Sequence, residues 1–161
     1  MVTAALLSST GCEEDTVQPC GSDWQPVELP SRNQSRVSIS QGVWGDVWFW
    51  EGNFQPNCPS GEVHAVSREM RIYELTSIQQ VDHLHGGFYE NITTELLATA
   101  WSDADGFFQV PLPVGRYSVF SVEDTLLYGN GGDGAGNISP IEVIDGKVTG
   151  IRFDIDYEAA Y

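Results

Sequence analysis

The sequence has few basic residues, and this shortage argues against several functions at the outset. Its 161 residues include 7 lysines and arginines against 23 aspartates and glutamates, a net charge of −16. Such a chain repels phosphate backbones and anionic lipid, so we expect no nucleic-acid partner and no direct docking on a membrane surface. Lys147 is the single lysine of the chain. Lys147 is therefore the one residue that could form a Schiff base with a substrate. An isopeptide bond of the adhesin kind needs a lysine in an early strand, and the chain has none there.

Recognisable catalytic motifs and helical periodicity are also lacking. The chain contains no G-x-S-x-G, H-E-x-x-H, P-loop or C-x-x-C sequence. No segment repeats apolar residues at a convincing helical spacing. A carboxylate pair of the glycosidase kind stays open as an alternative, although 23 acids make chance pairs common. We therefore expect a protein that is not an enzyme.

The chain has only three cysteines, and their positions indicate different roles. Residues 1–11 are a short apolar run that ends in small residues directly before Cys12. This resembles the end of a bacterial lipoprotein signal, which implies lipidation of Cys12, although a basic n-region is missing and the run is too short to span a membrane. We expect the true start of the signal to lie upstream. The alternative is a frayed N-terminus with a free thiol.

Cys20 and Cys58 remain as a pair once Cys12 is set aside. In an oxidising compartment they would form a disulfide, and in a reducing cytosol they would be two free thiols. The signal-like start favours the first case. We expect the protein at the outer surface of a bacterium, lipid-anchored or released, with a lipid anchor as its only link to the membrane.

Short alternating segments separated by turn residues predict an all-β domain. Residues 12–36 are polar and interrupted by prolines, which indicates a tether or extended arm, and residues 37–161 form one domain. A long connection over 77–94 indicates function or a short helix. The expected strands are 37–40, 42–51, 66–76, 96–101, 107–112, 116–122, 126–128, 141–144 and 148–157, with hairpins at 107–122 and, around the turn Asp145–Gly146, at 141–157. Asp103 and Gly106 suit a tight turn, and the Tyr117 hydroxyl can tie a corner.

The expected strand at 42–51 has two different faces. Val43, Val47 and Phe49 share one face, together with Gly45, and this face suits the core of a sandwich. The opposite face carries three tryptophans: Trp44, Trp48 and Trp50. If exposed, they would stack on sugar rings or on another protein. The alternative is that the N-terminal arm or the 77–94 connection covers them.

The segment from Ser102 to Val119 resembles the carboxypeptidase regulatory-like domain. It reads S-D-A-D-G-F-F followed by L-P-V-G-R-Y, close to that family's T-D-x-x-G-x-F and L-P-x-G-x-Y pattern. Residues 42–47 are similar to its opening strand and 141–151 to its closing hairpin. The resemblance implies a transthyretin-like (prealbumin-like) Greek-key β-sandwich of about seven strands with an extended N-terminal arm, in a non-catalytic adhesive, accessory or carrier module.

Two sets of polar residues are candidate metal ligands. Calcium prefers carboxylate, amide and carbonyl oxygens on glycine-rich loops, and ordinary turn chemistry is the alternative. The candidate calcium ligands are Asp103, Asp105, Asn130, Asp133 and Asn137. A weaker zinc or copper candidate joins His83 and His85 with His64, against the alternative of surface histidines.

These observations predict a non-catalytic extracellular module that binds a partner or assembles with itself. The expected partner is a protein, including further copies of this chain, or a glycan. One form of assembly is a fibre in which the arm adds a strand to a neighbour's open sheet edge. The alternatives are a calcium-dependent carbohydrate- or protein-binding domain and a small carbohydrate-active hydrolase with paired carboxylates.

Overall fold

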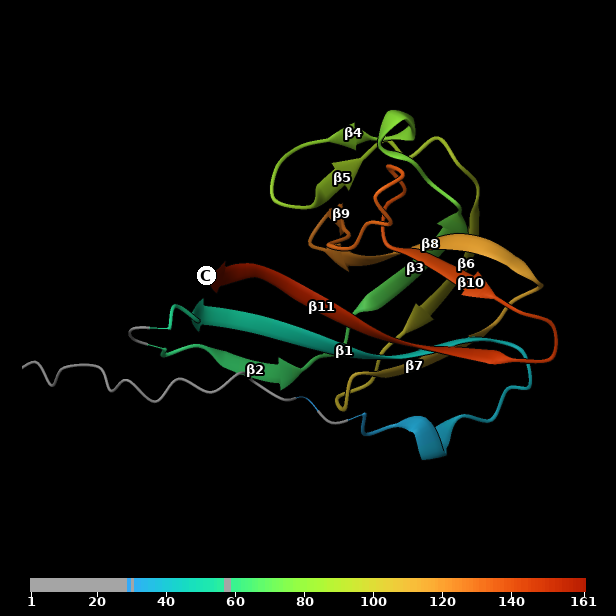
Figure 1. Cartoon of the computed structure of the whole chain (residues 1–161), viewed down its shortest axis with the longest axis horizontal. Coiled ribbons are helices and arrows are strands. Elements are labelled where there is room, and N and C mark those ends of the chain that lie inside the picture. The colour runs from blue at the N-terminus through green and yellow to red at the C-terminus, as the bar shows by residue number, and fades with distance from the viewer. Residues whose placement is uncertain (1–28, 30, 57–58) are drawn as a thin grey trace, which may run out of the picture.

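Two β-sheets lie face to face as a sandwich (Figure 1), which confirms the all-β prediction. The computed structural model describes residues 29, 31–56 and 59–161. Over these residues it contains eleven strands, more than the nine expected segments and the seven or so that the resemblance implies, and several of them are only two to four residues long. No helix in this part of the chain is long and apolar enough to cross a membrane.

The first sheet is built on two long strands, β1 and β11, that run side by side in the same direction (Figure 1). β2 and β7 share the opposite edge of β1, and both are antiparallel to it. The strands of this sheet are β1 (Gly42–Asn53), β2 (Glu62–Ala65), β7 (Phe107–Pro111) and β11 (Val148–Ala160). β11 is therefore an edge strand, and no strand of the described chain pairs with its other side.

The second sheet is antiparallel, with the order β4-β5-β9-β8-β3-β6 and with β10 on the same edge of β8 as β9. Its long strands are β3 (Glu69–Glu74), β6 (Leu96–Trp101) and β8 (Gly115–Glu123). Its short strands are β4 (Asp82–His83), β5 (Phe88–Glu90), β9 (Leu126–Tyr128) and β10 (Pro140–Val143). β6 pairs only with β3 among the described strands and forms the other edge of this sheet.

The core lies between the sheets and follows the two-residue alternation of the strands. Val43, Val47 and Phe49 of β1 face it, as the sequence predicts, and pack with buried residues such as Met70 and Ile72 of β3. Burial of these side chains is the main stabilising contribution, at about 1.5–3 kcal/mol for each large one.

A second apolar cluster covers the outer face of the second sheet. Tyr73 and Phe120 point away from the core, since their neighbours along β3 and β8 point into it, and they pack with Tyr89 and Ile138. Tyr89 belongs to the connection over 77–94, which contains the short 3₁₀ helix η2 (Ile78–Gln80), β4 and β5. The long connection therefore covers this sheet, and it contributes no side chain to the tryptophan-lined pocket of the first sheet.

Two turns that the sequence assigns to hairpins instead carry the chain from one sheet to the other. β7 pairs with β1 while β8 pairs with β3, and β10 pairs with β8 while β11 pairs with β1. The predicted hairpins at 107–122 and 141–157 are therefore wrong. The strands around each turn face one another across the core, so their apolar alternation looks the same as in a hairpin. Tyr117 ties the first corner by donating its hydroxyl to the Pro113 carbonyl at 2.8 Å.

The N-terminal side of β1 also differs from the expected strand at 37–40. Ser38 donates its backbone N–H to the side chain of Gln109 at 2.9 Å, and the Gln109 amide returns a bond to the Ser38 hydroxyl. Side-chain bonds thus replace a backbone ladder here. The short 3₁₀ helix η1 (Gln34–Arg36) precedes this segment and was not predicted.

Candidate functional site

The tryptophan face of β1 is covered. Trp44 and Trp48 are 9% and 2% exposed, and Trp50 is half-buried. Arg32 of the arm places its guanidinium 5.1 Å from the centre of the Trp48 ring, a cation–π contact. Trp50 donates its indole N–H to Asp154 of β11 at 3.1 Å. The three tryptophans therefore form no exposed row in this structure. The arm covers Trp48, in part as the second interpretation predicts, whereas Trp50 is covered by Asp154 and Phe54.

Buried polar contacts hold the described part of the arm on this sheet. Asn33 and Asp46 are each 4% exposed, and the Asn33 amide donates to the Asp46 carboxylate at 2.6 Å. Arg36 forms an ion pair with Asp103 and lies 3.7 Å from Asp105. Residues 31–36 are consequently a fixed cover and not a free strand donor.

The first predicted calcium loop is occupied by internal hydrogen bonds. Asp103 accepts the backbone N–H groups of Asp105 and Phe107 at 2.9 and 3.1 Å, which closes the turn before β7. The hydrogen bond from Arg36 lowers the pKa of the Asp103 carboxyl below its usual value. Gly106 completes the turn at φ +78°, as expected of glycine there.

The second predicted calcium loop is also closed on itself. Asp133 accepts a hydrogen bond from the Asn137 side-chain amide at 2.7 Å and forms an ion pair with Arg116 at 2.9 Å. The pKa of Asp133 is held far below its usual value, first by the Asn137 amide and then by the Ala135 N–H. Asn130 instead donates to Asp156 at 2.6 Å.

The two calcium loops and the histidines do not converge within the described chain. No hydrogen bond or ion pair joins 103–106 to 130–137 in that part of the structure, and no group of three or more histidine, cysteine, aspartate or glutamate residues there is placed to hold a metal ion. His83 stacks on Tyr89, whereas His64 packs on Phe49 of the other sheet and His85 on Phe88. Calcium binding stays a prediction.

The predicted cysteine roles fall outside the part of the chain that the structure describes. This applies to Cys12 as a lipidation site and to the Cys20–Cys58 disulfide. It also applies to the proposed signal remnant and to most of the tether. These assignments stay predictions.

A buried carboxylate that the sequence did not single out lies inside the sandwich. Glu123 is 6% exposed and accepts two hydrogen bonds of 3.1 Å from the Arg68 guanidinium. Tyr157 donates its hydroxyl to the same carboxylate at 3.1 Å. Burial, and then the Glu123 charge, raises the pKa of Tyr157 to about 12. The charge of Glu123 is thus matched by an arginine, which gives this group a structural role.

The outer edge of β11 is open over a short stretch. At the C-terminal end of this stretch, Asp156 donates its backbone N–H to the Tyr128 hydroxyl at 3.4 Å. At its N-terminal end, Thr149 donates its hydroxyl to the Glu142 carbonyl at 2.6 Å. Between them, the backbone of 150–155 pairs with β1 on one side and with no described strand on the other.

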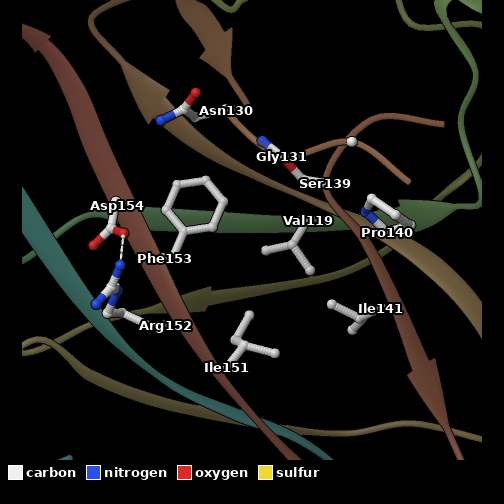
Figure 2. A pocket seen from close by; sticks show the side chains of 11 residues that line it. Val119, Asn130, Gly131, Ser139, Pro140, Ile141, Ile151, Arg152, Phe153 and Asp154 are labelled. Carbon is white, nitrogen blue, oxygen red and sulfur yellow. Dashed lines mark hydrogen bonds and ion pairs between the residues drawn. The ribbon is translucent and has the colours of Figure 1, made fainter. Parts of the chain in front are cut away.

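A pocket of about 310 Å³, the inner groove, lies on the core side of this edge, between β11 and β10 (Figure 2). Its apolar wall is made by Val119, Ile141 and Phe153, and the polar residues of its rim include Ser139 and Asn130. Arg152 and Asp154, on the β11 side, form an ion pair with each other at 2.8 Å. The groove therefore offers an apolar floor directly beside unpaired backbone.

A second pocket of about 270 Å³, the outer groove, lies on the other face of the same strand. It is lined by Trp44 and Trp48, by Leu29 and by residues 150–152 of β11. The open stretch of β11 thus has a pocket on each face. The sequence predicts the strand at 148–157, but the alternation of its side chains does not reveal its parallel pairing or its open edge.

β6, the edge of the second sheet, exposes apolar side chains. Leu96, Leu97 and Trp101 are 43%, 42% and 67% exposed, and the strand has no charged residue. Edge strands of this kind are prone to pair with another chain, because natural sheets otherwise protect them with charges or bulges. β6 is therefore a second surface able to take part in strand pairing.

Comparisons of the chain with protein-family models, with curated proteins and with solved structures find no match.

Proposed function

We propose that this chain is a non-catalytic module of the outer bacterial surface, lipid-anchored or released, that binds or assembles by accepting an extended strand at the edge of β11. Backbone hydrogen bonds give such strand addition its affinity, and pockets for alternate side chains give it specificity. The observation that carries the proposal is the open stretch 150–155 with one groove on each face.

The two grooves fit the geometry of an added strand. Successive side chains of a strand point to opposite faces of the sheet, so every second side chain would enter the inner groove and the others would face the outer groove. The inner groove ends on Val119, Ile141 and Phe153, which favours an apolar side chain there. A protein partner is favoured over a glycan, since the tryptophans suited to sugar stacking are largely buried.

The engagement of the acidic groups supports a non-catalytic role. A glycosidase-like pair needs two carboxyl groups that flank a substrate, one of them free to take up a proton. Glu123, the buried carboxylate beside β11, is held by Arg68 and Tyr157. Asp133 is held in its charged form by Asn137 and Arg116. Neither group is arranged to exchange protons with a ligand.

The proposed location rests on the sequence. The apolar run before Cys12 and the pair Cys20 and Cys58 are typical of an exported lipoprotein with a disulfide. The net charge of −16 supports solubility outside the cell.

The test uses a substitution that fills the inner groove. A Cβ at Gly131 would meet nothing closer than 3.5 Å and would lie at the groove wall, so Gly131→Ala leaves the groove open, and the larger side chain of Gly131→Trp is expected to obstruct it. We expect purified wild-type protein and Gly131→Ala to form concentration-dependent assemblies in sedimentation velocity, and Gly131→Trp to stay monomeric with the same melting temperature. Equal assembly of the Trp and Ala variants would contradict strand addition at β11.

A further inference from the structure

We infer that the strand accepted by β11 is the N-terminal segment Cys20–Gln25 of a second copy of this chain, with Trp24 in the inner groove. This inference rests on the proposed function and names its partner. It makes the assembly head-to-tail, because each copy has one donor segment and one acceptor edge. Such heterologous contacts produce open chains unless the rotation between copies happens to close a ring.

The composition of the segment fits the two faces of the acceptor. Between Pro19 and Pro26 lies a proline-free stretch of six residues, the same length as the open backbone at 150–155. Trp24 is its one large apolar side chain. With Trp24 directed to the inner groove, the adjacent Asp23 faces the opposite side, where Arg152, which also pairs with Asp154, supplies a positive charge. The more acidic stretch at 13–15 is a poorer donor, because Asp154 and Asp156 also lie along β11.

The position of Leu29 argues for a donor from another copy. Leu29 lines the outer groove of its own molecule beside Gly150 and Arg152. Trp24 stands five residues earlier, so to enter its own inner groove the arm would have to cross the edge of β11 from the outer face within about 17 Å of extended chain.

The residues that would have to make this crossing directly precede Leu29, and they are Pro26, Val27 and Glu28. Pro26 has no N–H to donate to the ladder, and Glu28 would bring a carboxylate close to Asp154. The arm is long enough to serve a neighbour, since residues 13–28 extend over about 50 Å.

The predicted pair of cysteines would then join neighbouring copies. Phe54 donates its backbone N–H to the Ala160 carbonyl at 2.7 Å, so the loop that contains Cys58 starts at the far end of β11. A donor that runs antiparallel to β11 with Trp24 in the groove directs Cys20 toward that end. We therefore expect covalent multimers on a non-reducing gel, which a reductant converts to single chains.

The experiment mixes two full-length variants, each impaired on one side of the contact. Trp24→Ala weakens the donor and Gly131→Trp blocks the acceptor, with Trp24→Phe and Gly131→Ala as matched controls. Each impaired variant alone should sediment as a monomer. Their equimolar mixture should form one-to-one dimers and nothing larger, because the intact donor of one enters the open edge of the other. Both controls should assemble like the wild type.

Other results would overturn the inference in distinguishable ways. If Trp24→Ala assembles like the wild type while Gly131→Trp does not, strand addition stands but the donor is another segment, such as β6 of a second copy. If the wild type is monomeric and hydrogen exchange at 150–155 accelerates in Trp24→Ala, the arm occupies its own edge. If the wild type is monomeric and neither substitution changes exchange there, the proposed function fails together with the inference.

Discussion

At the scale of single residues, the cover on the tryptophan face depends on a buried amide–carboxylate contact. The buried Asn33 amide donates a hydrogen bond to the Asp46 carboxylate at 2.6 Å and another to the Asp105 carbonyl at 3.1 Å. The contact of Arg32 with Trp48 and the ion pair of Arg36 with Asp103 hold the arm as well, but Asn33 supplies its buried polar attachment to β1.

Asn33→Ala should destabilise the fold by about 1–3 kcal/mol, because it leaves the Asp46 carboxylate buried without its donor. Urea unfolding measures the loss, and Gln34→Ala, on the exposed neighbour, should change it by less than about 0.5 kcal/mol. Equal unfolding midpoints for Asn33→Ala and the wild type would show that the arm does not depend on this contact.

A second residue-scale prediction concerns alkaline pH. The pKa of Tyr157 is raised to about 12 by burial and by Glu123, whereas an unfolded tyrosine ionises near pH 10. Between these values the folded state binds more protons than the unfolded state, so this contribution is complete below pH 10 and is lost as the pH rises toward 12.

Tyr157→Phe should therefore lose less stability than the wild type when urea unfolding is compared at pH 9 and pH 11. The stability of Tyr157→Phe should still fall somewhat with rising pH, because burial and Asp156 also raise the pKa of Tyr128. An identical loss in the two proteins would contradict the assignment of this pKa to Tyr157.

At the scale of elements, the turn before β7 needs glycine for two separate reasons. Gly106 has φ +78°, and a Cβ at this position would lie 2.5 Å from the Val47 carbonyl oxygen. Gly134 has a similar φ of +74° but nothing within 4 Å of its Cβ position. Substitutions at Gly106 and Gly134 therefore separate two contributions to the loss of stability, the left-handed backbone and the steric contact with β1.

Gly134→Ala should cost about 1 kcal/mol, and Gly106→Ala should cost about 1–3 kcal/mol more, because the turn must also move away from β1. Thermal unfolding of the two variants in one buffer measures the difference. Equal melting temperatures would mean that the turn relaxes freely and does not contact β1 closely.

The elements also show what the sequence could predict. The core face of β1, the turn at Asp103–Gly106 and the Tyr117 corner follow from local rules of alternation, side-chain capping and positive φ, and the structure confirms them. Which sheet each strand joins depends on contacts far along the chain. For this reason the local pattern at Asp145–Gly146 predicts a hairpin that the structure does not contain, and it does not reveal the parallel partner of β11.

The candidate site was still harder to predict. The tryptophans were visible in the sequence, but their cover depends on Asn33 meeting Asp46, and nothing in the local pattern signals that pairing. The inner groove combines Val119, Ile141 and Phe153 from three strands. Each of these residues looks like ordinary core in the sequence, because an open edge is a property of topology and not of composition.

At the scale of the whole molecule, charge opposes assembly. Every copy carries a net charge of −16, so neighbouring copies repel one another at low ionic strength. Salt reduces the screening length from about 30 Å at 0.01 M to about 8 Å at 0.15 M. Apolar burial in the inner groove and backbone pairing at β11 are much less affected by salt.

Assembly should therefore increase when salt is raised from about 0.01 M to about 0.15 M, over which repulsion between copies is screened. Sedimentation velocity at a fixed protein concentration measures the change. Assemblies that dissociate over the same range would indicate that ion pairs, and not strand addition, hold the copies together.

The most direct measurement is amide hydrogen exchange of the full-length protein, compared between dilute and assembled samples. The account predicts that those amides of 150–155 whose N–H groups point away from β1 become strongly protected on assembly, because an added strand accepts their hydrogen bonds, while amides of β6 keep their rates. Assemblies in which 150–155 exchange as fast as in the dilute protein would contradict strand addition at β11.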